Sequence, residues 1–293
     1  MVGTLRATLG VTLAAHAVPA ITSIGPLRRH LLPGLSGAGD PGHIALTFDD
    51  GPDRASTPAF IDALAEHGVK ATFFLLGRML EAAPELGASL VEAGHEVAVH
   101  GWDHRCMLVR GGREAYDDLA RAKDAIAAAT GQVPRWYRPP YGVLSSSALW
   151  AARRLDLTPV LWTNWGRDWT HSATPASVLG TLTRHLRGGA TVLLHDSDCT
   201  SAPGSWRNTL AALPALFKGA RARGLSIGPL RDHAVRVDRR SRQARLHRDR
   251  LRQARLRRAQ LSKVTACSGH PGPAGLPAPG SSGEVPPSPL TAP

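Results

Sequence analysis

Cysteine is scarce in this sequence, and no long apolar run is present. Only three cysteines, Cys106, Cys199 and Cys267, occur among the 293 residues, and no two of them have Cys-x-x-Cys spacing. An odd number of scattered thiols predicts neither a disulfide framework nor a zinc site made of thiolates. No apolar stretch reaches the ~18 residues that a membrane-spanning helix needs. These absences argue against a small disulfide-stabilised protein and predict no transmembrane helix.

Positive charge is abundant but unevenly placed along the chain. The net charge is +12, yet residues 236–263 alone contain 12 Lys or Arg and 2 Asp, a net charge of +10. This leaves 23 of the 35 basic and 21 of the 23 acidic residues elsewhere, a net charge of only +2. The basicity therefore belongs to a tail, and the nearly neutral body argues against a nucleic-acid-binding domain.

Between His43 and His233, apolar strand-like runs alternate with amphipathic stretches of helical length. This repeated order predicts an α/β domain with a parallel sheet, either doubly wound or closed into a barrel. The predicted strands are Ile44–Phe48, Ala71–Leu76, Glu96–Val99, Arg135–Tyr137, Thr158–Thr163, Thr191–Leu194 and Leu225–Ile227. The predicted helices are Pro58–His67, Glu85–Ala93, Arg113–Ala129, Ser145–Leu155, Pro175–Leu186 and Trp206–Arg223.

Two flanking segments, residues 1–42 and 234–293, border this predicted domain of residues 43–233. In the first, an apolar stretch over Leu9–Ile24 is interrupted by His16 and preceded by little positive charge. It is predicted to be either a secretory signal or a packed lead-in to the first strand. A signal predicts a secreted or cell-envelope protein, and a lead-in leaves the cytoplasm as the alternative. Residues 234–293, basic and then rich in Pro, Gly and Ser, are predicted to be a disordered tail.

Five polar clusters stand at or shortly after the ends of predicted strands. Taken singly, each has an ordinary interpretation as a turn, a surface histidine pair, an ion pair or a hydrogen-bonded core histidine. Active sites of parallel α/β folds form at the carboxyl ends of the strands, so five such clusters predict one shared pocket. The clusters are Asp49–Pro52, His100–His104, Arg138–Gly142, Arg167–Trp169 and His195–Asp196.

The residue types in these clusters together fit a metal-assisted hydrolase. Two imidazoles and one carboxylate make a three-ligand site that leaves a position open for water, as catalytic zinc requires. A bound metal lowers the pKa of that water and polarises a carbonyl group. A second carboxylate can take the water's proton, and a further histidine can protonate the leaving group. This set of groups predicts hydrolysis of an amide or an ester.

In their order along the chain, the clusters resemble the motifs of the polysaccharide deacetylase family, the NodB homology domain or carbohydrate esterase family four. The resemblance runs from about His43 to about Leu230. Five ordered motifs make a chance match negligible, although any single short motif can match by accident. The matching segments are Thr47–Gly51, His100 with His104, Arg138–Gly142, Asp168–Trp169 and Leu193–His195.

This resemblance implies a fold and a metal site. The implied fold is a distorted, incomplete (β/α) barrel of the NodB type. The implied cofactor is one divalent metal ion, commonly zinc, held by Asp50, His100 and His104.

The resemblance also implies how protons move during the reaction. Asp49 is implied to be the general base, and Arg138 holds this carboxylate ionised and oriented. His195 is implied to be the general acid, and Asp168 positions its imidazole.

Three further residues are implied to bind the substrate. The backbone N–H of Tyr141 stabilises the tetrahedral oxyanion together with the metal, and Trp169 and Leu193 wall the pocket for the acetyl methyl group. Two positions depart from the family pattern. Gly101 replaces the usual Ser or Thr after the first histidine, which removes a hydroxyl that braces the loop. Trp165 replaces an earlier Asp of the fourth motif and changes the wall of the cleft.

Three functions are compatible with these observations. The first is removal of acetyl groups from N-acetylglucosamine units of an acetylated glycan, such as peptidoglycan or a chitin-like polymer. The second keeps the site but acts on O-acetyl esters, as on acetylxylan. The third is a polyanion-binding protein with a vestigial site, in which the tail binds an anionic polymer or surface without specific nucleic-acid recognition. The presence of both Asp49 and His195 argues against the third.

Overall fold

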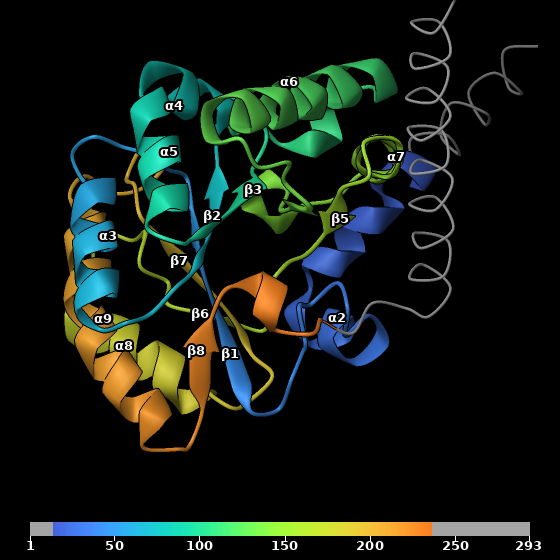
Figure 1. The fold of residues 1–293 in the computed structure, drawn as a ribbon. Coiled ribbons are helices and arrows are strands. Elements are labelled where there is room, and N and C mark those ends of the chain that lie inside the picture. The colour runs from blue at the N-terminus through green and yellow to red at the C-terminus, as the bar shows by residue number, and fades with distance from the viewer. Residues whose placement is uncertain (1–13, 236–293) are drawn as a thin grey trace, which may run out of the picture. The chain divides into compact units, whose positions relative to one another are not determined.

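A computed structural model describes residues 14–235, and its centre is one parallel sheet (Figure 1). The sheet of this described part has eight strands, of which seven run in the order β5-β4-β3-β2-β1-β7-β6, and β8 pairs with β1. All pairings are parallel. The strands are β1 (His43–Asp49), β2 (Thr72–Leu75), β3 (Glu96–Val99), β4 (Trp136–Tyr137), β5 (Thr158–Pro159), β6 (Asn164–Trp165), β7 (Thr191–His195) and β8 (Ser226–Gly228).

The two edge strands, β5 and β6, follow one another in the chain and are joined by residues 160–163. The backbone N–H groups of this link bond first to Tyr137 on β4, then to Leu35, and then to Thr191 on β7. The link therefore crosses from one edge of the sheet to the other and curls it toward closure. The distorted, incomplete (β/α) barrel is confirmed.

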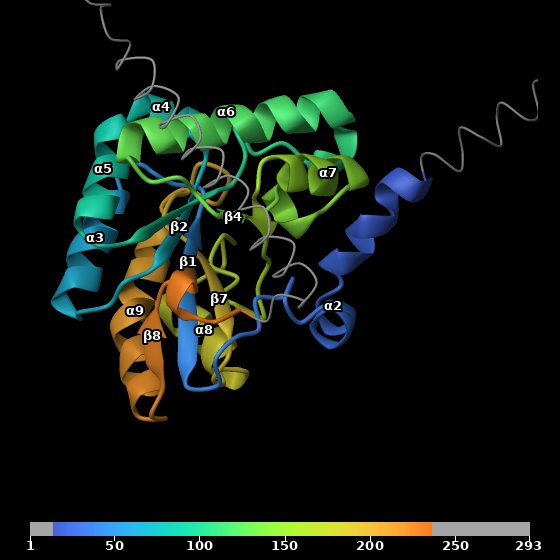
Figure 2. The same ribbon diagram turned by 45° about the vertical axis from the view of Figure 1, so that its right-hand side comes forward.

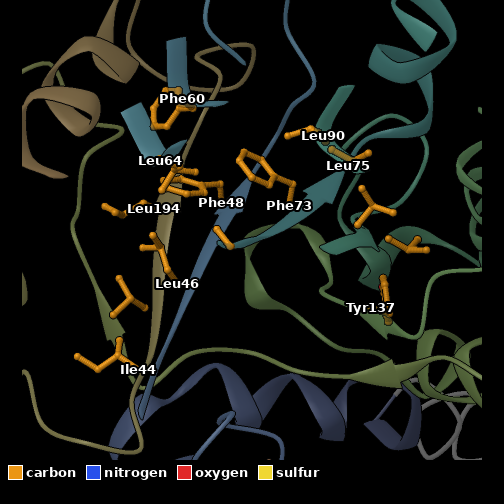
Figure 3. Packing of buried hydrophobic residues seen from close by; sticks show 14 of the residues in the cluster. Ile44, Leu46, Phe48, Phe60, Leu64, Phe73, Leu75, Leu90, Tyr137 and Leu194 are labelled. Atoms are coloured by element: carbon orange, nitrogen blue, oxygen red, sulfur yellow. The ribbon is translucent and has the colours of Figure 1, made fainter. Parts of the chain in front are cut away.

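Helices cover the outer face of this curved sheet. Phe60 and Leu64 on α3, with Leu90 on α5, join the same buried cluster as Phe48 and Phe73 of the sheet (Figure 3). The helices of the described chain are α2 (Gly25–Leu31), α3 (Thr57–Glu66), α4 (Gly77–Ala82), α5 (Pro84–Glu92), α6 (Gly112–Thr130), α7 (Ser146–Arg154), α8 (Pro175–Arg184) and α9 (Ser205–Arg221). Within residues 14–235, no helix has the length and apolar character needed to cross a membrane.

Side chains alternate between the two faces of each strand, and this alternation decides which residues reach the barrel interior. On β1, Ile44, Leu46 and Phe48 pack against the helices, whereas Ala45 joins a smaller cluster on the inner face. Because the side-chain period of a strand is two residues, Asp49 shares the inner face with Ala45. On β7 the same rule separates Val192 and Leu194 from the inward-facing Thr191, Leu193 and His195.

The segment before β1 packs on the open side of the barrel. Arg28 of α2 is only 3% exposed and donates to the carbonyls of Thr22 (2.7 Å) and Trp162 (2.8 Å). Figure 2 shows α2 on the side of the sheet away from α3. The described part of the predicted lead segment therefore contacts the link between β5 and β6.

One predicted strand, Thr158–Thr163, is wrong. The structure ends β5 at Pro159 and begins β6 at Asn164. The physical reason is that residues 160–163 cross between the two sheet edges, so their backbone N–H groups bond to different segments and not to one neighbouring strand. Helix α4 was not predicted, because its six residues are too short for a periodic pattern. The first 13 residues, and the predicted tail from Arg236 onward, lie outside the described residues.

Candidate active site

The five predicted clusters meet at the carboxyl ends of the central strands. Asp49 ends β1 and lies opposite His195, which ends the neighbouring β7. His100 follows β3 directly, and Arg138 follows β4 directly. Asp168, in the loop after β6, contacts His195. Parallel pairing places these strand ends at one edge of the sheet, which is why residues far apart in the sequence form one site.

The three predicted metal ligands form a compact donor set. One ligand atom from each of Asp50, His100 and His104 lies within 4.8 Å of the others. Asp50 Oδ1 lies 3.3 Å from His100 Nε2 and 3.4 Å from His104 Nε2. Ligand atoms about 2.0–2.1 Å from a tetrahedral ion are about 3.3–3.4 Å apart, so these separations suit such an ion.

An unpaired polar atom in this donor set supports the same interpretation. Asp50 Oδ1 is buried and has no hydrogen-bond partner among the described residues. Asp50 Oδ2 accepts a hydrogen bond from Thr200 Oγ1 at 2.6 Å. His100 Nδ1 donates to the Arg138 carbonyl at 2.8 Å, so once Nε2 has lost its proton, that nitrogen has a lone pair for a metal. A buried carboxylate oxygen facing two imidazole nitrogens fits a cation, and the residues present therefore fit a divalent metal.

Burial and neighbouring charges have opposing effects on the pKa values of the donor-set residues. Burial disfavours the charged form of His100, but the Asp49 and Asp50 carboxylates raise its pKa. Burial and the neighbouring charge of His100 lower the pKa of His104 to about 4. Burial alone would raise the pKa of Asp50, yet the surrounding histidines, His100 foremost, lower it. The site therefore favours an ionised Asp50 and a neutral His104, which are the protonation states that bind a metal.

Asp49 is held by a fully buried arginine. Arg138 Nη1 donates to Asp49 Oδ1 at 2.6 Å and to Thr47 Oγ1 at 2.8 Å. Its other nitrogens donate to the carbonyls of Leu161 (3.0 Å) and Val160 (3.4 Å). Burial lowers the pKa of Arg138 and the Asp49 carboxylate opposes this. The pair leaves Asp49 Oδ2 facing the donor set, 3.7 Å from His100 Nε2.

His195 belongs to a second buried pair on the other side of the site. Its Nδ1 donates to Asp168 Oδ1 at 2.9 Å, and its backbone N–H donates to Asp168 Oδ2 at 2.8 Å. Thr209 on α9 also donates to Asp168 Oδ2, at 2.7 Å. Burial lowers the pKa of His195, but the Asp168 carboxylate outweighs this and raises it to about 10. This arrangement fixes the ring with Nδ1 protonated.

Backbone strain is concentrated at the site. Asp50, His104 and Tyr141 have φ values of 81°, 60° and 59°, in the left-handed region that residues with a side chain rarely adopt. Each such residue costs about 1–3 kcal/mol, so the surrounding structure must hold it in place. The Tyr141 ring lies 4.6 Å from the His104 ring between centroids. Three of the left-handed residues in the described chain therefore lie at or beside the donor set.

Two predicted wall residues border His195. The Trp169 ring lies 5.6 Å from the His195 ring between centroids, nearly perpendicular to it. Leu193 shares the inner face of β7 with His195 and is 4% exposed. Tyr141, in contrast, is 63% exposed. Apolar walls thus flank the imidazole of His195, and an exposed aromatic side chain lies beside the donor set.

The loop that carries the two histidines is braced by an acidic residue on α6. Asp118 Oδ2 accepts a hydrogen bond from the backbone N–H of Trp102 at 3.1 Å. A Cβ atom at Gly101, where φ is +95°, would lie 3.1 Å from that same oxygen. Arg110 Nη2 lies 3.2 Å from Asp118 Oδ1. The predicted loss of a bracing hydroxyl at Gly101 is therefore offset by a carboxylate that contacts the loop backbone.

Two supporting threonines escaped the sequence analysis, which noted a third buried group, Asp196, only as a member of the last cluster. Thr200 holds Asp50, and Thr209 holds Asp168. Asp196 is fully buried and accepts from Thr57 Oγ1 at 2.7 Å. Burial raises the pKa of Asp196 to about 7. The threonines have no local pattern that marks them, because their role depends on which strand end each one meets in space.

Comparisons with known proteins agree with this geometry. The family model described as polysaccharide deacetylase matches residues 36–160. The chain is 37% identical over 195 residues to a chitooligosaccharide deacetylase of Bradyrhizobium sp. (strain ANU 289), covering 64% of this chain and 88% of that protein. It is 36% identical over 163 residues to the peptidoglycan-N-acetylglucosamine deacetylase PgdA of Listeria monocytogenes, covering 54% of this chain but only 33% of that protein.

Two solved structures are similar over most of the barrel. The Bc1960 peptidoglycan N-acetylglucosamine deacetylase has a TM-score of 0.62 at 26% identity, covering 68% of this chain and 91% of that one. BA3943 from Bacillus anthracis, described as a pseudoenzyme of carbohydrate esterase family four, has a TM-score of 0.60 at 27% identity, covering 66% and 65%. Fold and site together define an α/β barrel with a metal-type donor set at its strand ends. The chain belongs to the polysaccharide deacetylase family, carbohydrate esterase family four.

Proposed function

We propose that this protein is a metal-dependent deacetylase that removes acetyl groups from N-acetylglucosamine units of a glycan, in peptidoglycan or a chitin-like polymer. One observation carries the proposal. The donor set of Asp50, His100 and His104 lies between a buried carboxylate–arginine pair and a buried histidine–carboxylate pair. One relative is named a chitooligosaccharide deacetylase and the other a peptidoglycan-N-acetylglucosamine deacetylase, and these names support the substrate class.

Asp50, His100 and His104 would hold the metal, with zinc as the proposed ion. A divalent ion bound there would polarise the acetyl carbonyl and lower the pKa of the attacking water. Thr200 keeps the second oxygen of Asp50 occupied, so that Oδ1 remains directed at the two histidines. The Arg138 carbonyl orients the His100 ring by accepting from Nδ1. These outer contacts fix the ligands before the ion binds.

Asp49 is proposed as the general base. Its Oδ1 is occupied by Arg138, and its Oδ2 faces the donor set, where it can accept the proton of the attacking water. The buried guanidinium stabilises the ionised carboxylate and prevents its rotation. A base held in this way contributes about 10²–10⁴-fold to the rate.

His195 is proposed as the general acid that protonates the leaving amine. Asp168 holds its Nδ1, so Nε2 is the nitrogen that can deliver a proton to the substrate. The Asp168 carboxylate raises the pKa of His195 to about 10, which keeps the ring protonated at neutral pH. The backbone N–H of Tyr141 is proposed to stabilise the oxyanion, and Trp169 and Leu193 to enclose the acetyl methyl group.

The decisive experiment is mass spectrometry of the purified protein incubated with N-acetylglucosamine oligomers and with acetylated xylan oligomers, with and without added Zn²⁺. The proposal expects zinc-dependent replacement of acetyl by hydrogen on the N-acetylated oligomers. Release from acetylated xylan alone would make the protein an O-acetyl esterase. Release from neither, with metal bound, would place the protein with the inactive members of its family.

We further propose that the protein works outside the cytoplasm, in the secreted fraction or the cell envelope. The support is chemical, because the polymers proposed as substrates lie outside the cell membrane. Cell fractionation, followed by determination of the N-terminal residue of the purified protein, tests this. A cytoplasmic protein that still begins at Met1 would contradict it.

A further inference from the structure

A positively charged cavity extends from Tyr141 and Trp165, near the candidate active site, to the segments that precede β1 and β7. It has a volume of about 960 Å³ and lies between α2, the link at residues 160–163, β6 and the segment that joins α8 to β7. Three arginines, Arg28, Arg29 and Arg187, line it together with two histidines, and its lining among the described residues includes no Asp or Glu. Cavities of this size accommodate a small organic ligand or a short saccharide.

The arginines of this cavity lack anionic partners within residues 14–235. Arg28 is 3% exposed, its guanidinium bonds only to backbone carbonyls, and its Nε has no hydrogen-bond partner in that part of the chain. The charges that act on it are those of Arg29 and Arg138, which with burial lower the pKa of Arg28 to about 10. A buried cation without a counter-charge is costly, so an anion in the cavity would relieve an existing electrostatic penalty.

The two other arginines are available to contact a ligand. Arg29 and Arg187 are exposed, and neither pairs with a carboxylate within residues 14–235. Arg29 makes one long hydrogen bond, 3.3 Å to the Thr163 carbonyl. A guanidinium has five donors in a planar fork that matches a carboxylate, and Arg29 therefore retains donors for a second partner.

A run of aromatic rings connects this cavity with the catalytic histidine. Trp162 and Trp165 line the cavity and are stacked, with centroids 5.9 Å apart and planes at 26°. Trp165 lies 5.1 Å from Trp169, and Trp169 lies 5.6 Å from His195. Tyr141 also lines the cavity, and its ring lies 4.6 Å from the ring of His104 between centroids. Such surfaces cover the apolar face of a sugar ring, so one saccharide chain can extend from the site into the cavity.

We propose that this cavity is a subsite for an acidic sugar residue, which carries a carboxylate and lies in the same glycan chain as the acetamido sugar at the active site. The proposal rests on the proposed function. Arg29 and Arg187 would contact the carboxylate, and Arg28 would add a buried positive charge. Arg28 and Arg29 precede the region matched by the family model, which begins at residue 36. The subsite is therefore built partly from a segment that the family match does not include.

The test compares substrates of one length and different charge. The wild-type protein with its metal would be assayed on an N-acetylglucosamine tetramer, on a tetramer that alternates N-acetylglucosamine with glucuronic acid, and on one that alternates it with N-acetylmuramic acid. The two acidic tetramers distinguish a carboxylate on the ring from a carboxylate on a lactyl ether. The wild type is expected to have the higher kcat/KM on at least one acidic tetramer.

The variant is Arg29→Gln combined with Arg187→Gln, which removes two exposed charges and disturbs no buried contact. The ratio of kcat/KM for the acidic tetramer to that for the neutral tetramer is expected to fall about tenfold, because charge-assisted hydrogen bonds are lost. Arg184→Gln is the matched control, since Arg184 is exposed on α8 but does not line the cavity. The control is expected to keep the wild-type ratio.

Two outcomes separate the subsite from the proposed function. If the neutral tetramer is deacetylated but the double variant keeps the wild-type ratio, the subsite is wrong and the function stands. If no tetramer is deacetylated, calorimetric titration of the wild type, the double variant and the control with the two acidic tetramers tests the subsite. Binding that weakens about tenfold in the double variant but not in the control supports the subsite without the function. Equal binding by the wild type and the double variant overturns the subsite.

Discussion

Metal binding at this site depends on side chains that come from two separate loops. Asp50 follows β1, and the two histidines follow β3, so neither loop alone supplies three ligands. Asp50 Oδ1 is the atom that the two imidazoles share. Loss of one ligand therefore leaves a pair that holds a divalent ion weakly, and loss of both histidines removes the site.

We expect His100→Ala and His104→Ala each to lower zinc affinity at least about tenfold, with the double variant losing stoichiometric metal. Metal content after gel filtration, together with competition against a chelator, measures this. His171→Ala is the control, because His171 is exposed and outside the donor set. One zinc per chain in the double variant would show that the ligands are elsewhere.

Proton transfer is expected to be separable from metal binding. Asp49→Asn and His195→Ala remove groups that lie beside the donor set without belonging to it. Both variants should retain zinc and lose about 10²–10⁴-fold in kcat, the contribution of a general base or acid. Zinc content and kcat are measured on the same samples. Normal turnover of an N-acetylated oligomer by His195→Ala would exclude it as the acid.

The alkaline limb of the profile of kcat against pH is expected to depend on the Asp168–His195 pair. The proposed role of His195 as general acid needs its protonated form, and the Asp168 carboxylate raises the pKa of His195, which is about 10. Activity therefore persists at alkaline pH and falls as the pH rises through that value. In Asp168→Asn the stabilising charge is lost, so the alkaline limb of kcat should move to lower pH. The profiles of the wild type and the variant are measured between pH 6 and 11. The same alkaline limb in both proteins would show that another group causes it.

At the scale of elements, the alternation of side chains along β1 and β7 explains how the barrel combines a core with a polar site. The apolar positions of these strands face the helices, and the intervening positions face the interior. Thr47 and Thr191 occupy such inner positions, and their hydroxyls donate to the carbonyls of Val192 (2.6 Å) and Gly37 (2.7 Å). The two faces follow from the strand geometry, because the side-chain period of a strand is two residues.

The link between β5 and β6 is expected to depend on Arg28. Arg28→Ala would leave the carbonyls of Thr22 and Trp162 without their donor, so we expect a loss of about 1–3 kcal/mol in the free energy of unfolding. Urea unfolding followed by tryptophan fluorescence measures it. Arg29→Ala should change stability little, because Arg29 is exposed. Equal stability of Arg28→Ala and wild type would show that this segment does not support the barrel.

At the scale of the whole molecule, the body and the basic tail are expected to act separately. Residues 236–263 carry a net charge of +10 in the sequence. We propose that they bind an anionic polymer or surface non-specifically; the alternative is a solvated extension without function. Such binding weakens steeply with salt, because charges are screened and counterions are released.

Truncation after Val235 tests this separation. The cut must follow His233, which is buried, contacts His43 Nδ1 at 2.8 Å and accepts the Asp40 N–H at 2.8 Å through its carbonyl. Activity on short neutral oligomers should remain within about twofold, since every residue proposed for the active site lies before the cut. Low-salt binding to heparin, used as a polyanion, should be lost. Binding that survives truncation would locate the basic surface in the body.

The sequence by itself determined the α/β fold class and the residues that gather at the strand ends. Strand-length apolar runs alternating with amphipathic helices require a parallel sheet, and clusters at strand ends must converge on one edge of it. The residues Asp49, Asp50, His100, His104, Arg138, Asp168 and His195 were all predicted to share this site, and the structure brings them together. Local patterns were sufficient here because each residue's position follows from the end of its own strand.

Only the tertiary structure decided how that site is closed and supported. The predicted strand Thr158–Thr163 became a link between the two sheet edges, because its hydrogen-bond partners are Leu35 and Thr191, far away in the sequence. Thr200, Thr209 and Asp118 support the site from other elements and carry no local signal. The cation-lined cavity likewise depends on α2 lying beside that link. Contacts of this kind are set by packing between distant segments, and no periodicity within one segment encodes them.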